Sequence, residues 1–139
     1  MPKVFTSKHQ KIGELGEKIA TRFLMKQKFT ILERNYTKPW GEIDIIAKKK
    51  NKIHFVEVKS VTEKLLTNFS SLKDKDIDFH CPEENMHPLK MKRISRTIST
   101  YLSSKNIDEE TLWQVDLIVV IINLEKRKTK IKLVKDIIL

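Results

Sequence analysis

Residues 41–59 read GEIDIIAKKKNKIHFVEVK, two runs of alternating apolar side chains on either side of a run of lysines. Gly41–Ala47 and Ile53–Lys59 each have the alternation of apolar and polar side chains that is typical of a half-buried strand. Lys48–Lys52 between them is polar and predicts a turn, whose type stays open because the run has no glycine. The stretch therefore predicts an antiparallel β-hairpin.

This hairpin would bring two acidic side chains together. Asp44 lies between isoleucines in the first strand, and Glu57 lies between valines in the second. The midpoint between them in the sequence falls between Lys50 and Asn51, so a turn of two or four residues would place them opposite each other, with Cβ atoms about 5 Å apart. Lys59 comes two residues after Glu57 and projects from the same face of its strand.

Two adjacent carboxylates in apolar surroundings repel each other, and they are costly to bury unless a cation lies between them. Mg²⁺ (or Mn²⁺) suits a site with one or two carboxylates, waters and a phosphate oxygen. Such a metal polarises a phosphate and lowers the pKa of a bound water, while an adjacent lysine stabilises the developing charge. Asp44, Glu57 and Lys59 therefore supply the groups needed for phosphodiester hydrolysis. The alternative is a cross-strand ion pair on a solvated surface, which a lysine-rich chain forms readily.

The rest of the chain gives a coherent element order. The same periodicities predict a helix over 8–28, a strand Phe29–Glu33, a turn region Asn35–Trp40, a helix from Pro88 to near Ser104, and strands Trp113–Ile122 and Lys130–Val134. The long polar segment 61–87 predicts a flexible loop. We expect residues 1–139 to form a single domain of the α/β class, a mixed β-sheet flanked by helices in the order α-β-β-β-α-β-β.

The charge of the chain favours polyanionic partners. Its 139 residues include 28 Lys and Arg against 18 Asp and Glu, a net charge of +10. Nucleic acid is the expected partner, and an excess of lysine favours contact with the phosphate backbone over reading of bases. A single cysteine excludes a disulfide scaffold. No apolar run approaches the length of a membrane span, and the first ten residues lack the apolar core of a secretory signal, so we expect a cytoplasmic protein without a membrane partner.

The hairpin motif, GEIDIIA followed by HFVEVK, resembles the core motif of the PD-(D/E)XK nuclease superfamily. The chain is more closely similar to uncharacterised protein family 0102, the YraN-like bacterial proteins. Further positions fit that family's pattern, namely Gly13, Gly16, Glu17 and Ala20 in the first helix, Asn35, Lys90 and Asp116.

The resemblance implies a restriction-endonuclease-like fold, related to that of Holliday junction resolvases. It implies that Asp44, Glu57 and the backbone carbonyl of Val58 bind the metal and that Lys59 is the catalytic lysine. It also implies that Glu17 reaches the site from the first helix. Related resolvases act as dimers, so a homodimer is a further expectation from this resemblance.

We therefore expect a metal-dependent nuclease that binds DNA and hydrolyses its phosphodiesters, with branched or damaged DNA among its substrates. The cations expected to contact the nucleic acid are Lys90, Lys92, Arg93, Lys48 and Lys49. One alternative is a non-catalytic nucleic-acid-binding module of the same fold, and another is a basic subunit that binds other proteins. Two further choices stay open at this stage. Asp116 is either catalytic or a satisfied buried acid, and Tyr36 and Trp40 either stack on bases or pack in the protein.

Overall fold

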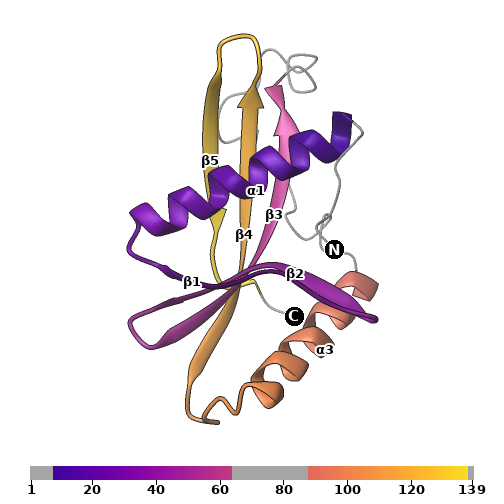
Figure 1. Ribbon diagram of the computed structural model, residues 1–139, viewed down its shortest axis with the longest axis vertical. Helices are drawn as coiled ribbons and strands as arrows, with labels where there is room; N and C mark the ends of the chain where they lie inside the picture. Colours follow the sequence, from indigo (N-terminus) through magenta and orange to yellow (C-terminus); the bar gives the residue numbers. More distant parts are fainter. Residues whose placement is uncertain (1–7, 64–87, 138–139) are drawn as a thin grey trace.

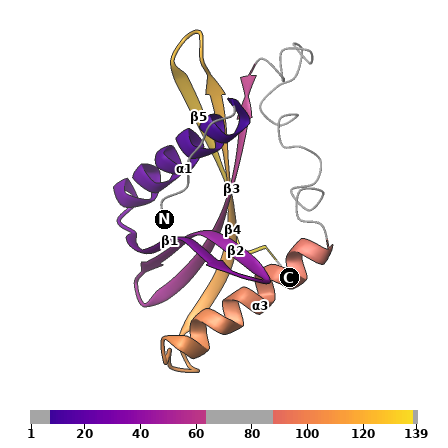
Figure 2. The ribbon, with the colours of Figure 1, turned by 45° about the vertical axis from the view of Figure 1, so that its right-hand side comes forward.

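The computed structural model describes residues 8–63 and 88–137, which form a mixed sheet with one helix on each face (Figures 1 and 2). In chain order the elements are α1 (Lys8–Lys26), β1 (Thr30–Lys38), β2 (Gly41–Lys49), β3 (Lys52–Thr62), α3 (Pro88–Ser104), β4 (Leu112–Asn123) and β5 (Lys128–Val134). The strands of these described residues lie in the order β1-β2-β3-β4-β5, and only β3 and β4 are parallel. The predicted α/β class and element order are confirmed.

The β2–β3 hairpin has the predicted register. Ile45 pairs with Val56, and Lys49 pairs with Lys52, so the turn consists of two residues. These residues are Lys50 and Asn51, with φ values of 50° and 64°. Positive φ at both central positions is the mark of a type I′ turn, whose twist matches that of the flanking strands. Asparagine tolerates this region well, which explains how the turn forms without glycine.

The first helix is shorter than predicted, because it ends at Lys26 rather than at residue 28. Lys28 has a φ of 72°, and the Phe29 amide donates to the Leu24 carbonyl over 3.0 Å. A left-handed residue followed by this long-range bond is the Schellman termination of a helix. Phe29 and Leu24 also pack in the same apolar cluster, which fixes how the chain enters β1.

The first strand is longer than predicted. β1 continues to Lys38, and Lys38 pairs with Gly41, so the predicted turn region Asn35–Trp40 contracts to Pro39 and Trp40. The strand accommodates a register shift between Ile31 and Glu33. Exposed and half-buried residues alternate along β1, and none is fully buried, because β1 lies at the edge of the sheet.

The observed bounds of other strands also differ from the predicted ones. Val61 and Thr62 belong to β3, so the start of the predicted loop 61–87 is a strand. Residues 64–87, where the flexible loop is expected, lie outside the described residues. β5 begins at Lys128, two residues before the predicted start. Within the described part of the chain, no helix is long and apolar enough to span a membrane.

The helices α1 and α3 lie on opposite sides of the sheet (Figure 2), and an apolar core lies beneath each of them. The core beneath α1 contains Ala20, Leu24, Ile45, Ala47, Val56, Ile118, Val120 and Ile122. The core beneath α3 contains Ile43, Ile46, Ile53, Phe55, Ile94, Ile98, Tyr101 and Val115. Residues of even number in β4 contribute to the first core and Val115 to the second, as the alternation of side chains along a strand requires. The sheet is thereby fixed between both helices, which positions the site described next.

Candidate functional site

The predicted acidic pair lies where β2 and β3 separate. Backbone pairing of the two strands ends at Ile45 and Val56, one residue short of Asp44 and Glu57. Beyond that point, the Val58 amide donates to Oδ2 of Asp44 over 2.8 Å. The Asp44 carboxylate thus takes the place of a backbone carbonyl of β2 as the acceptor for the Val58 amide. The amide and carbonyl of one strand residue point to the same side, so the Val58 carbonyl also faces the side of β3 on which Asp44 lies.

Glu57 is buried, with 5% of its surface exposed. Its Oε2 lies 3.4 Å from Nζ of Lys90 at the start of α3. Its Oε1 is buried and has no hydrogen-bond partner among the described residues. Burial, followed by the negative charge of Asp44, raises the pKa of Glu57 from 4.5 to about 8, and Lys90 opposes this shift. A buried carboxylate oxygen without a partner is costly and marks a place where a cation would be stabilised.

Asp44 shares these electrostatics. Burial raises the pKa of Asp44, and the hydrogen bond from Val58 opposes that shift. Glu17 forms a side-chain hydrogen bond that lowers the pKa of Asp44. Glu17 thus reaches the site from α1 through its hydrogen bond to Asp44, and its part in catalysis stays a prediction.

A close approach of α1 to β3 places Glu17 there. A Cβ at Gly16 would lie 2.8 Å from the Cβ of Ser60, so only glycine lets the helix cross the strand at this distance. Glu17 follows Gly16 directly and is thereby held at the level of Asp44. Small residues on the inner face of this helix thus serve the site as well as the packing.

The cations predicted for the site divide into two groups. Lys90 contacts Glu57, and Lys92 and Arg93 follow it on the exposed side of α3. Lys48 and Lys49 lie toward the other end of β2, four and five residues beyond Asp44, which is roughly 13–17 Å along a strand. The structure thus brings Lys90 to the acidic pair, places Lys92 and Arg93 around a cleft that Glu42 also lines, and leaves Lys48 and Lys49 apart.

Lys59 is exposed and, two residues after Glu57, projects from the same face of β3. Its role as the catalytic lysine stays a prediction. The lysine that forms an ion pair with Glu57 is nevertheless Lys90, which lies 33 positions later in the sequence, so the hairpin pattern alone could not assign it.

The donor set suits a hard divalent cation. Asp44 and Glu57 offer carboxylate oxygens and Val58 a carbonyl oxygen, and Mg²⁺ commonly takes one or two carboxylates and keeps several waters. Among the described residues, no group of three or more His, Cys, Asp or Glu is arranged to hold a metal ion. The buried oxygen of Glu57 without a partner is the observation that favours a cation here.

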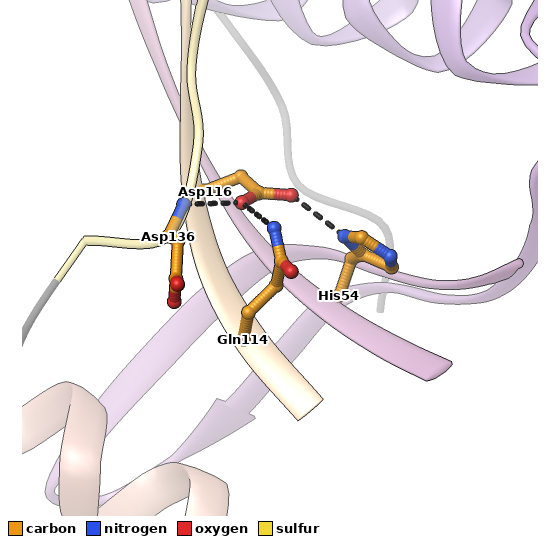
Figure 3. A network of polar contacts seen from close by, with 4 residues as sticks. All are labelled: His54, Gln114, Asp116 and Asp136. Carbon is orange, nitrogen blue, oxygen red and sulfur yellow. Dashed lines mark hydrogen bonds and ion pairs between the residues drawn. The ribbon is translucent and has the colours of Figure 1, made fainter. Parts of the chain in front are cut away.

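A second polar cluster lies on the face of the sheet covered by α1 (Figure 3). Asp116, 3% exposed, accepts from the Gln114 side chain over 2.6 Å and from the Asp136 amide over 2.9 Å, and it contacts Nδ1 of His54 at 2.8 Å. Each carboxylate oxygen therefore has a partner. Of the two roles considered for Asp116, the satisfied buried acid agrees with this network. Sequence reasoning missed His54 as its partner, because the two residues are 62 positions apart.

The fold and the site define a mixed α/β protein with an acidic pair at the open end of a β-hairpin, flanked by the basic start of a helix. The model of the uncharacterised protein family UPF0102 matches residues 16–120. The chain belongs to this family, as its hairpin motif indicated. The match covers α1 from Gly16, the whole hairpin, α3 and most of β4, so every residue of the acidic site lies within it.

Curated relatives share most of the chain. A UPF0102 protein of Dictyoglomus thermophilum is 38% identical over 97 residues, 70% of this chain and 71% of its own length. One from Caldanaerobacter subterraneus is 38% identical over 115 residues, 83% of each chain. One from Flavobacterium psychrophilum is 29% identical over 130 residues, 94% of this chain and 95% of its own. The similarity therefore extends over the whole architecture described here.

Proposed function

We propose that this chain is a metal-dependent nuclease, which binds Mg²⁺ or Mn²⁺ at Asp44, Glu57 and the Val58 carbonyl and hydrolyses DNA phosphodiesters. The observation that carries the proposal is the convergence of the two carboxylates, where burial and the charge of Asp44 raise the pKa of Glu57. A divalent cation between them would relieve this repulsion, and the buried Oε1 of Glu57, which has no hydrogen-bond partner among the described residues, would bind it. The resemblance to the PD-(D/E)XK nucleases, which use these residue types in this order, supports the same assignment.

Each residue of the site would have its own role in hydrolysis. A bound divalent ion polarises the phosphate and lowers the pKa of an attacking water. Asp44 and Glu57 hold the positive charge at the end of the hairpin, and Glu17 positions Asp44 through their hydrogen bond. Lys59, exposed on the face of Glu57, would donate hydrogen bonds to the phosphate and stabilise the negative charge that develops on it.

DNA is the partner that the charge favours. The net charge of +10 suits a polyanion, Lys90 contacts the acidic pair, and Lys92 and Arg93 follow on the same helix, α3. These cations can offset the repulsion between a phosphate backbone and the carboxylates. We include branched and damaged DNA among the substrates because of the resemblance to junction resolvases.

The test is cleavage of a panel of labelled substrates, comprising single-stranded, duplex, flap and four-way-junction DNA together with a single-stranded RNA, in Mg²⁺, Mn²⁺ or EDTA. We expect metal-dependent cleavage of at least one DNA by the wild type. Glu57→Gln and Lys59→Ala should lose it by roughly 100-fold or more, the scale of removing one group that stabilises the transition state. Glu125→Gln, at an exposed turn position, is the matched control and should keep full activity. Equal activity in all four proteins would identify a contaminant and contradict the proposal.

A second candidate function is a nucleic-acid-binding module without catalysis. The ion pair between Lys90 and Glu57 favours it, because the lysine ammonium already supplies a positive charge to one oxygen of the acid. Calorimetric titration with Mg²⁺ and Mn²⁺ separates the two functions. The nuclease predicts saturable binding that Glu57→Gln abolishes, whereas the binding module predicts tight DNA binding with neither metal binding nor cleavage.

A further inference from the structure

A basic cleft of about 580 Å³ lies between the β1–β2 turn and α3. The turn contributes Lys38 and Trp40, and α3 contributes Lys92, Arg93 and Arg96. Glu42 is the acid that lines the same cleft, so four cations face one anion. A concentration of cationic side chains around a cavity favours an anionic ligand.

Gly41 shows that the cleft depends on close contact between the turn and the helix. A Cβ at Gly41 would lie 2.8 Å from Oγ1 of Thr97 and 3.2 Å from the Cβ of Arg93. Thr97 is fully buried and donates to the Arg93 carbonyl over 2.7 Å, so it cannot easily move away. The absence of a side chain at Gly41 thus lets the turn sit directly on α3 and sets the width of the cleft.

Trp40 fixes the position of one of these cations. The Arg96 guanidinium lies 4.3 Å from the centre of the Trp40 ring. Stacking on an aromatic face restrains a guanidinium while leaving its N–H groups at the edge available as donors. Arginine recognises phosphate through two parallel hydrogen bonds, and restraint before binding reduces the entropy lost on forming them.

The cleft adjoins the acidic pair. Glu42, which lines the cleft, lies two residues before Asp44 on β2, about 7 Å along the strand, so the two sites are neighbours. Along α3, Arg96 comes six residues after Lys90, which is about 9 Å along the helix axis. At a rise of about 3.4 Å per nucleotide along the axis of a DNA helix, that distance corresponds to two to three nucleotides.

We infer that this cleft binds the sugar-phosphate backbone of a DNA strand. A second phosphate of the same strand, two to three nucleotides from the cleft, then lies at Asp44 and Glu57. Arg93 and Arg96 donate to the phosphate oxygens, and Lys38 and Lys92 add positive charge. Trp40 is a positioning residue that holds Arg96. The path of the strand from the cleft to the acidic pair rests on the proposed function. Binding of the backbone at the cleft itself needs no metal.

The first test is DNA binding in EDTA as a function of salt, with a labelled single-stranded oligodeoxynucleotide as the probe. The variants are Arg96→Ala and, as matched control, Arg22→Ala, since both arginines are exposed on helices and Arg22 lies on α1 across the sheet. Loss of one phosphate contact on a single strand should reduce the slope of log K against log salt by about 0.7 and weaken binding roughly fivefold near 0.1 M salt. The control should keep the wild-type slope. Equal slopes for the two variants would overturn the inference.

The second test uses Trp40 as a reporter. The chain has two tryptophans, so Trp113→Phe leaves Trp40 as the only one. Trp113 packs edge to face on Phe55, a contact that phenylalanine can retain. The oligodeoxynucleotide should change the fluorescence of Trp40, and Arg96→Ala should remove that change. No change in Trp40 fluorescence at saturating oligodeoxynucleotide would overturn the inference. An equal change with inorganic phosphate, at the same concentration of phosphate groups, would also overturn it, because it would indicate a site for small anions.

The two proposals fail separately. If Arg96→Ala reduces the salt slope but no substrate is cleaved, the cleft binds the backbone and the nuclease proposal is wrong. If the wild type cleaves DNA and Arg96→Ala binds and cleaves as the Arg22→Ala control does, the nuclease proposal stands and the cleft is not a backbone subsite.

Discussion

Nζ of Lys90 lies 3.4 Å from Oε2 of Glu57, so one ion pair joins the start of α3 to the middle of β3 beside Asp44. The two partners differ in exposure, because about half of the Lys90 side chain is exposed while Glu57 is buried. Burial and the charge of Asp44 raise the pKa of Glu57, and Lys90 lowers it. The protonation of Glu57 therefore depends on how many positive charges stand at its oxygens.

Removing Lys90 should raise the pKa of Glu57 further. In Lys90→Met the methionine keeps most of the length of the side chain and loses the ammonium that favours the ionised acid. Carboxyl carbon chemical shifts followed through a pH titration by NMR give the pKa directly. Lys92→Met, two residues away and exposed, is the control and should leave it near the wild-type value. An unchanged or lower pKa in Lys90→Met would contradict the assigned electrostatics.

The raised pKa of Glu57 should make the protein less stable as the pH rises. Between the ordinary value of 4.5 and about 8, the folded state holds a proton that the unfolded state has lost, so stability falls through that window. Glu57→Gln has no such proton and should gain roughly 3–5 kcal/mol relative to wild type above pH 8, with no gain below pH 4.5. Urea unfolding at both ends of the window measures this. Glu125→Gln should follow the wild type throughout; a Glu57→Gln curve that does the same would refute the prediction.

Two glycines in α1 should respond in opposite ways to the same change. Gly16→Ala forces a Cβ against Ser60 and should cost about 1–3 kcal/mol, with Glu17 displaced from Asp44. At Gly13, no described atom lies within 4 Å of an added Cβ, so Gly13→Ala should stabilise the helix by about 0.5–1 kcal/mol. Thermal unfolding compares the two variants. Adding Ser60→Gly to Gly16→Ala should recover part of the loss, and equal effects of the two alanines would disprove the proposed helix–strand contact.

The cluster around Asp116 should support the fold and leave the acidic site unchanged. Asp116→Ala removes the acceptor of Gln114 and of the Asp136 amide and the partner of His54, so it should cost about 2–4 kcal/mol of unfolding free energy. Metal binding measured at a temperature where the variant is folded should match that of wild type. Loss of metal binding in a folded Asp116→Ala protein would assign this residue to the site.

Much of the fold could be predicted from the chain because its signals are local. The alternation in β2 and β3 and the polar run between them set the hairpin, and the midpoint between Asp44 and Glu57 gave its register. The end of α1 was placed two residues late because a lysine, Lys28, takes the left-handed position that glycine usually marks. β1 was predicted too short because its sequence, TILERNYTK, alternates weakly between apolar and polar residue types, as an edge strand that buries none of its residues fully allows.

The site could be predicted only in part, because some of its contacts join distant segments. The hairpin carries the information for Asp44, Glu57 and the side of Lys59. The pairing of Lys90 with Glu57 depends instead on how α3 packs against the sheet, which no local pattern encodes. The same holds for Arg96 on Trp40, since the helix and the turn meet only in the folded chain.

Paramagnetic broadening by Mn²⁺ tests the metal site most directly. Substoichiometric Mn²⁺ added to ¹⁵N-labelled protein should broaden the amide signals of Glu57 and Val58 and leave those of the β4–β5 turn, such as Lys126, sharp. Added Mg²⁺ should restore the signals, and Glu57→Gln should abolish the selective loss. Uniform broadening along the chain, or the same broadening in Glu57→Gln, would contradict a divalent cation held between the two carboxylates.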